Sequence, residues 1–183
     1  MDQVFAVPCT RRWEERETES WLAAARGGEA WALERFFNLY QAQVYSLCYR
    51  MLGRAEDAQD ATQTAFIKAF RSLPRFRGES GVRTWLYRIA VNEAVSLVRS
   101  RRVTSDLTDE SGPAPEPALV ERLAVEQTLT QVTPDHRAVL VLRFWEGLSY
   151  EEIACVLQIS LPAAKMRLHR ARDEFRRCYE ENR

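Results

Sequence analysis

Apolar residues recur every three or four positions along most of the chain, which is the spacing of one face of an α-helix. In the stretch 55–73 this face consists of Ala58, Thr62, Ala65, Phe66, Ala69, Phe70 and Leu73. We find no segment with the two-residue alternation of a β-strand and no internal repeat. The pattern predicts an all-α fold, and the few glycines and many Ala, Leu, Arg and Glu residues agree with it.

Breaks in this pattern predict four helices in the N-terminal half, over residues 18–26, 29–52, 55–73 and 82–101. Glycines at 27, 28 and 53 end the first two, because glycine readily takes the backbone conformation that closes a helix. The third ends at Leu73-Pro74, since the residue before a proline disfavours the helical conformation. A polar loop over 74–81 then leads into the fourth helix.

Four more helices are predicted in the C-terminal half, over residues 119–132, 134–145, 150–157 and 161–179. Thr133 precedes Pro134 and is predicted to cap the second of these helices, with the proline at its first position. Ser149 and Glu152 form a capping box, S-x-x-E, at the start of the third. A turn over 158–160 separates the last two helices.

One stretch, VTSDLTDESGPAPEPA at residues 103–118, is rich in Pro, Ser and acidic residues and has almost nothing to bury. It predicts a flexible linker between two small helical domains. The predicted parts are an N-terminal extension over 1–17, a four-helix domain over 18–102, the linker over 103–118 and a second helical domain over 119–183.

The formal net charge is zero, so bulk charge favours no class of partner, but the charges are unevenly placed. Residues 83–102 contain five arginines and one glutamate, and residues 160–177 contain six basic and two acidic residues. Residues 103–121 between them contain five acids and no base. Two basic segments on either side of an acidic tract predict two surfaces that face a polyanion.

The sequence shows no motif for a metal, a cofactor, catalysis or membrane insertion. The N-terminus lacks the basic region of a signal peptide and no apolar run could span a bilayer, so we expect a cytoplasmic protein. We expect reduced thiols, no metal site and no cofactor, because the relevant residues are scattered: Cys9, Cys48, Cys155, Cys178, His136 and His169. No nucleophile–base pair or phosphate-binding loop supports an enzyme, for instance a small hydrolase.

The strongest motif is at the C-terminus, where a helix, a short turn and a second, basic helix form a helix-turn-helix pattern. The predicted inner face of the final helix is Ala164, Leu168, Ala171 and Phe175, and its outer face carries Lys165, Met166, His169, Arg170 and Arg172 or Asp173. Small residues at its start and long donors beyond suit entry into a DNA major groove. A solvated amphipathic helix would show the same spacing, so the pattern alone leaves both interpretations open.

A second polar row lies on the predicted helix 82–101, where one face carries Trp85, Arg88, Asn92, Ser96 and Arg99. Arginines neutralise phosphates, an amide pairs with a base edge, and an aromatic ring stacks on an exposed base. These residue types suit the binding of opened DNA. Core packing explains Trp85 equally well, and Tyr87 is expected to lie in the core.

Two blocks of sequence resemble the two domains of bacterial RNA polymerase sigma factors. DAQDATQTAFIKAFRSL followed by FRGESGVRTWLYRIAVN is similar to their N-terminal domain, and LVLRFWEGLSYEEIACVLQISLPAAKMRLHRARDEF is similar to their C-terminal promoter-binding domain. The blocks occur in the family's order and are joined by a short linker with no middle domain. This layout resembles that of the extracytoplasmic-function (ECF) sigma factors, and the likeness extends over residues 18–179.

The resemblance implies three binding surfaces. The minus-ten promoter element would be bound, and its strands separated, by Phe76, Arg77, Gly78, Glu79, Ser80, Trp85, Arg88, Asn92 and Arg99. The minus-thirty-five element would be bound by Lys165, Met166, Arg167, His169 and Arg170. The largest subunit of core polymerase would be bound by Asp57, Asp60, Gln63 and Thr64. In this assignment Asn92 contacts a flipped base, and residues 76–81 form its pocket.

At four places the sequence departs from the family pattern. Thr64 stands for an acidic residue, Met166 for a small polar residue, Gln158 for a glycine of the turn, and Ala163-Ala164 for a Gly-Thr pair. We expect the departures in the final helix to change the minus-thirty-five sequence that is recognised, but not the DNA-binding role. A glutamine where the backbone needs a positive φ costs about 1 kcal/mol or more.

The resemblance implies a non-catalytic initiation subunit that binds core RNA polymerase and promoter DNA, and it allows an anti-sigma factor as a further partner. Three alternatives stay open: a helix-turn-helix regulator that does not join polymerase, the small enzyme considered above, and a polymerase-binding adaptor that starts no transcripts. Association with core polymerase would exclude the first, and transcription starts would exclude the third.

Overall fold

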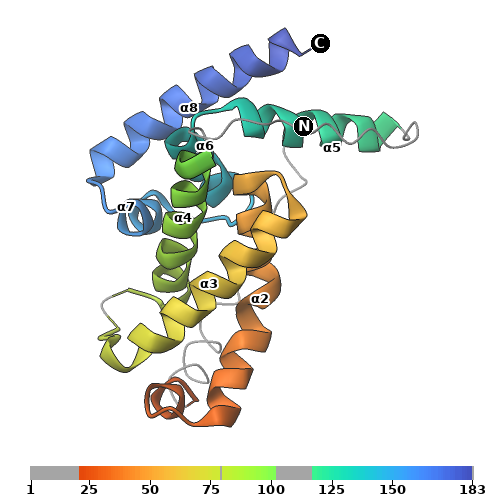
Figure 1. Cartoon of the computed structure of the whole chain (residues 1–183). Coiled ribbons are helices and arrows are strands. Elements are labelled where there is room, and N and C mark those ends of the chain that lie inside the picture. Colours follow the sequence, from red (N-terminus) through yellow and green to blue (C-terminus); the bar gives the residue numbers. More distant parts are fainter. Residues whose placement is uncertain (1–20, 79, 102–116, 183) are drawn as a thin grey trace.

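The computed structural model describes residues 21–78, 80–101 and 117–182, and all regular elements in these ranges are helices (Figure 1). Residues 21–26 are helical, and the N-terminal domain continues with α2 (Ala30–Leu52), α3 (Ala55–Ser72), the short 3-10 helix η1 (Leu73–Arg75) and α4 (Val82–Arg101). The C-terminal domain comprises α5 (Pro117–Gln131), α6 (Pro134–Phe144), α7 (Tyr150–Leu157) and α8 (Leu161–Glu181). The predicted all-α fold with two helical domains is confirmed.

The bounds of α2 to α8 lie within two residues of those predicted from the sequence. The predicted extension over 1–17 lies outside the described residues, and so does the predicted linker apart from residues 117–118, with which α5 begins. None of the described helices is long and apolar enough to cross a lipid bilayer.

A cluster of aromatic rings forms the core of the N-terminal domain. Phe36 of α2 is fully buried, and its ring centroid lies 6.1 Å from that of Phe66 and 5.9 Å from that of Phe70, both on α3. These separations are typical of favourable edge-to-face ring pairs. The predicted apolar face of α3 thus packs on α2, and the small buried residues that allow this close approach are Ala58, Ala61, Ala65 and Ala69.

The start of α6 is not capped as the sequence predicts. Thr133 precedes α6, but its hydroxyl makes no capping hydrogen bond to the helix. Instead, Glu174 of α8 accepts hydrogen bonds from the Thr133 backbone N–H, at 2.9 Å, and from the Thr133 hydroxyl, at 3.1 Å, and also contacts Nδ1 of His136. A carboxylate suits this helix end because the helix dipole is positive there. The predicted capping box of Ser149 and Glu152 is present in α7.

The two domains pack against each other, with α4 against α7 and α2 against α5 and α6 (Figure 1). The fully buried Tyr87 of α4, expected in the core, donates its hydroxyl hydrogen to Glu146 after α6, with 2.5 Å between the oxygens. Burial and the Glu146 carboxylate raise the pKa of Tyr87, and burial also raises the pKa of Glu146. Arg137 of α6 donates to the backbone carbonyl of Met51 in the last turn of α2. Buried polar contacts therefore join the two domains.

Replacing Gln158 by glycine is expected to stabilise the protein. Gln158 ends α7 with φ 54° and ψ 44°, a left-handed conformation in which an L side chain is strained. Its side chain is exposed, so little packing is lost. We expect Gln158→Gly to raise the free energy of unfolding by up to about 1 kcal/mol, measured by urea denaturation. Gln158→Ala keeps the strain and should give no gain, and a glycine variant with lower stability would refute the explanation.

Glu174 is expected to make stability depend on pH. Burial raises its pKa, but the hydrogen bonds from His136 and Thr133 outweigh this and lower the pKa below its ordinary value. The stabilisation by the carboxylate is therefore present above the unfolded-state pKa, near 4.5, and is lost as the pH falls through the lower folded-state pKa. Glu174→Gln should cost about 1–2 kcal/mol at pH 7, because a charge-assisted hydrogen bond is lost.

Urea denaturation of the Glu174→Gln variant and the parent protein from pH 7 to pH 3 would test this dependence. The difference in stability should shrink below about pH 4. Glu180→Gln, at an exposed position of the same helix, is the control and should change little at any pH. A constant difference over the whole range would show that the carboxylate charge is not involved.

Candidate nucleic-acid interface

Two aromatic residues predicted to bind DNA hold the loop before α4 in place. Phe76 and Trp85 are 8% and 6% exposed, and their ring centroids lie 4.9 Å apart. The rings therefore anchor the loop in the domain core and do not offer open faces to a ligand in this conformation. The other predicted loop residues are the exposed Arg77 and Gly78, the half-buried Ser80, and Glu79, which lies outside the described residues.

The predicted polar row of α4 divides between the core and the surface. Trp85 is buried near the helix start, Arg88 is half-buried, and the later members Asn92, Ser96 and Arg99 are exposed. Phe76 contacts the row at Trp85, and the turns from Asn92 onward are open. Arg99 also forms an ion pair, at 3.4 Å, with Asp135 of α6. The open part of the row offers an amide, a hydroxyl and a guanidinium to a nucleic acid.

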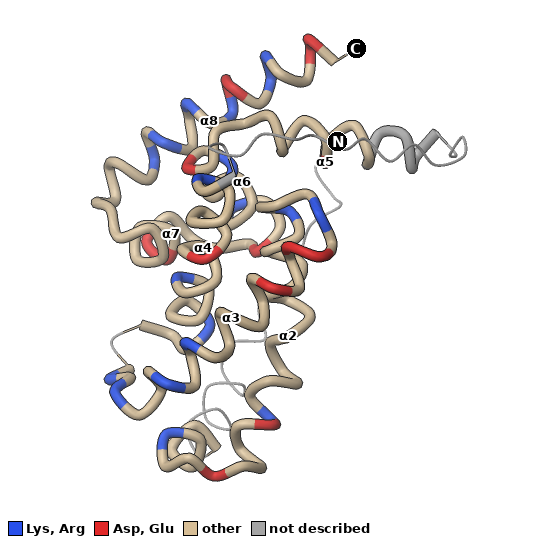
Figure 2. Tube along the Cα trace, viewed as in Figure 1, with Lys and Arg blue, Asp and Glu red and all other residues tan. Residues whose placement is uncertain are grey.

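The face of α3 predicted to bind polymerase is partly open. Asp60 and Gln63 are exposed and Thr64 is half-buried, whereas Asp57 is only 8% exposed. Asp57 therefore does not belong to the open surface in this conformation. Figure 2 shows the acidic residues of α3 in its N-terminal half. Ile67, one helical turn after Gln63, is 44% exposed and adds an apolar position to this face that sequence reasoning missed.

The helix-turn-helix pattern is present, with α7 and α8 packed together, and Lys and Arg residues recur along α8 (Figure 2). The predicted inner residues Ala164, Leu168 and Ala171 are buried. A cap that sequence reasoning missed begins α8, where the Ser160 hydroxyl accepts a hydrogen bond from the Ala163 N–H at 3.3 Å. The predicted outer residues Lys165, Met166, His169 and Arg170 are exposed, and Arg167 is half-buried.

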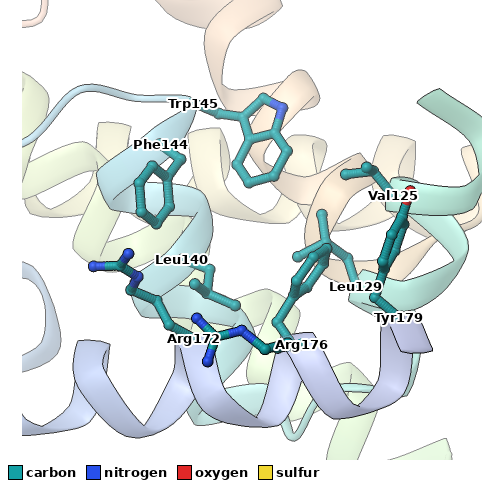
Figure 3. Close-up of a pocket in the computed structure, with 9 residues that line it drawn as sticks. Val125, Leu129, Leu140, Phe144, Trp145, Arg172, Arg176 and Tyr179 are labelled. Carbon is teal, nitrogen blue, oxygen red and sulfur yellow. The ribbon is translucent and has the colours of Figure 1, made fainter. Parts of the chain in front are cut away.

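An apolar groove of about 420 Å³ lies between α5, α6 and α8 (Figure 3). Its lining includes Leu140, Phe144 and Trp145 of α6 and the segment after it, with Arg172 and Arg176 at the α8 side. Phe144 and Trp145 are exposed, which is unusual for adjacent aromatic residues and suits the binding of apolar side chains. The sequence signal was this aromatic pair at the end of an apolar run, directly before Glu146-Gly147.

Three cysteines lie in the described part of the chain, and Cys48 is the buried one. Burial raises the pKa of Cys48 to about 12, so its thiol stays protonated at neutral pH. Cys155 is exposed and Cys178 is half-buried, and neither forms a disulfide within the described residues. In the part of the chain that the structure describes, no group of three or more His, Cys, Asp or Glu residues is placed to hold a metal ion.

Comparison with known families assigns both domains. Residues 36–104 match the family model for Sigma-70 region 2, and residues 122–175 match that for Sigma-70 region 4. The first range contains α4 and its loop, and the second contains the helix-turn-helix.

Several curated proteins are similar over most of their length. The chain is 36% identical over 177 residues to the RNA polymerase sigma-H factor of Pseudomonas aeruginosa, covering 87% of this chain and 92% of that protein. It is 32% identical over 174 residues to the ECF RNA polymerase sigma factor SigW of Bacillus subtilis, covering 85% and 93%. It is 38% identical over 162 residues to the ECF RNA polymerase sigma-E factor of Escherichia coli, covering 76% and 84%.

Two solved structures share the fold. CnrH, solved in complex with the cytosolic domain of CnrY, has a TM-score of 0.70 at 24% identity, covering 89% of this chain and 97% of that chain. RpoE of Bartonella quintana, solved with the anti-sigma factor NepR, has a TM-score of 0.64 at 23% identity, covering 82% and 98%. With the sequence matches over both domains, the chain belongs to the sigma-70 family of bacterial RNA polymerase sigma factors, in its ECF group.

Proposed function

We propose that this ECF sigma factor acts in the cytoplasm as a non-catalytic subunit that joins core RNA polymerase and contacts two promoter elements, one with each domain. The observation that carries the proposal is the exposure of two separate polar surfaces on one chain: the later turns of α4 and the outer face of α8. A single helix-turn-helix regulator would need only the second surface. The family membership agrees with promoter recognition and transcription initiation.

For the minus-thirty-five element, we assign recognition to the exposed residues at the start of α8. Lys165 and Arg170 are long donors on the outer face, and Met166, 57% exposed, offers an apolar contact. The half-buried Arg167 lies nearer the side of the helix and is assigned to a phosphate. His169 is the remaining predicted residue and adds a ring to the same face. Its Nδ1 lies 3.1 Å from Oδ2 of Asp173.

For the minus-ten element, we assign base contact to Asn92 and phosphate contacts to Arg88 and Arg99. An amide can donate to and accept from a base edge at once, and guanidinium groups give salt-dependent affinity for phosphates. Phe76 and Trp85 support the loop over 76–81 from the core side, so we assign them to shaping the pocket. Capture of an unstacked base offsets the few kcal/mol that unstacking costs.

For core polymerase, we assign binding to the exposed Asp60 and Gln63 and the half-buried Thr64 of α3, to which a basic partner surface would be complementary. An anti-sigma factor is a further proposed partner. RpoE of Bartonella quintana was solved with the anti-sigma factor NepR, and the groove between α5, α6 and α8 offers this chain an open apolar surface for such a protein (Figure 3).

Transcription with core polymerase and genomic DNA, followed by sequencing of the RNA 5′ ends, tests the promoter assignment. We expect defined starts that share two upstream motifs. Asn92→Ala and Lys165→Ala should each reduce these transcripts about tenfold, because one specific base contact is worth about 1–3 kcal/mol. Gln41→Ala and Arg26→Ala, at exposed positions outside the proposed surfaces, are the matched controls. Polymerase binding without any defined starts would instead favour the adaptor alternative.

Asp60→Ala combined with Gln63→Ala is expected to weaken binding to core polymerase about tenfold, because polar contacts across an interface are lost. The affinity can be measured by fluorescence anisotropy of the labelled protein. Glu180→Ala on α8 removes an exposed acid elsewhere and should leave the affinity unchanged. Equal affinity of the double variant and the parent protein would remove α3 from the polymerase interface.

A further inference from the structure

Two cations lie over the ring of Tyr150 at the junction of three helices. The guanidinium carbon of Arg143, on α6, lies 5.1 Å from the centre of the Tyr150 ring, and Nζ of Lys165, on α8, lies 5.7 Å from it. Both distances are within the range of a cation–π interaction. Tyr150, the first residue of α7, therefore connects the helix before the motif to the recognition helix.

Contacts other than the one with Lys165 hold the Tyr150 ring in place. The capping box of Ser149 and Glu152 fixes the backbone at the start of α7, and the half-buried ring packs against the domain core. Arg143 donates a hydrogen bond to the Leu148 carbonyl at 2.8 Å, which orients its guanidinium. Arg143 and Tyr150 thus form a fixed platform.

Lys165 depends on this platform for its orientation. Its side chain is exposed, and among the described residues no carboxylate lies within ion-pair distance of its ammonium group. A lysine has four rotatable side-chain bonds and loses much rotamer entropy when it is fixed. Contact with Tyr150 restricts the ammonium to the α7 side of the recognition helix, so less entropy is lost on binding.

We propose that Tyr150 is a positioning residue that aims Lys165 at one base pair of the minus-thirty-five element. The proposal rests on the function proposed above for α8. Guanine is the base that an ammonium group suits best in the major groove, because its O6 and N7 are adjacent acceptors. Tyr150 gives the recognition helix selectivity at this base pair without contacting the base itself.

The test uses the full-length protein in complex with core polymerase and a promoter obtained from the mapped start sites. Affinity is measured for the promoter and for every single-base change in its upstream motif. Lys165→Ala should abolish the base preference at one position. Tyr150→Leu, which keeps an apolar side chain but removes the ring, should reduce the preference at that same position about threefold to tenfold. Tyr150→Phe keeps the ring and should retain the preference.

The double variant Tyr150→Leu with Lys165→Ala should match Lys165→Ala alone, because the positioning effect requires the lysine. Thermal unfolding identifies variants that have lost stability. A uniform loss at all positions in Tyr150→Leu would mean that the ring only supports the fold, and would overturn the proposal. An equal loss in Tyr150→Phe would assign the effect to the hydroxyl and overturn it as well. If Lys165→Ala changed no base preference, the assignment of α8 would fail, and this proposal with it.

Discussion

The arrangement of the two domains depends on the guanidinium of Arg137. This side chain is 3% exposed, and it donates hydrogen bonds to the carbonyls of Met51, of Thr130 at 2.5 Å and of Val132 at 3.0 Å. These carbonyls lie at the carboxyl ends of α2 and α5, which supply the negative ends of two helix dipoles to the buried cation. The same site requires Gly53, since a Cβ there would lie 2.6 Å from the Thr130 methyl carbon.

The parts of the fold that sequence reasoning predicted correctly are those determined by neighbours in the sequence. The apolar face of α3 and the capping box at Ser149 depend on residues three or four positions apart, so the pattern was sufficient to predict them. The cap at Thr133 was predicted wrongly because the Thr133 hydroxyl bonds to Glu174, a residue distant in sequence, and the Glu174 carboxylate also accepts from the Thr133 N–H. The packing of the domains through Arg137 likewise could not be predicted, because it joins residues far apart in the sequence.

In the candidate site, too, features set by local spacing could be predicted and features set by distant residues could not. The outer face of α8 could be predicted from helical spacing, because the helix has a single buried side. On α4 the spacing was correct, but Trp85 is covered by Phe76, which lies in a loop whose path no periodicity describes. Asp57 is a similar case, since its spacing matches Asp60 while the structure buries it. The contacts of Tyr150 could not be predicted from the sequence, because its cationic neighbours come from two other helices.

The contact between α4 and α7 has a consequence for how tightly the isolated chain can hold a promoter. Beside this contact, Arg99 of α4, which we assign to a phosphate of the promoter, pairs with Asp135 of α6 at 3.4 Å in the free protein. A contact that has to break when DNA binds lowers the apparent affinity by the fraction of molecules in which it is already broken. The C-terminal domain and the promoter therefore compete for one guanidinium, and the stability of the domain contact enters the promoter affinity of the free chain.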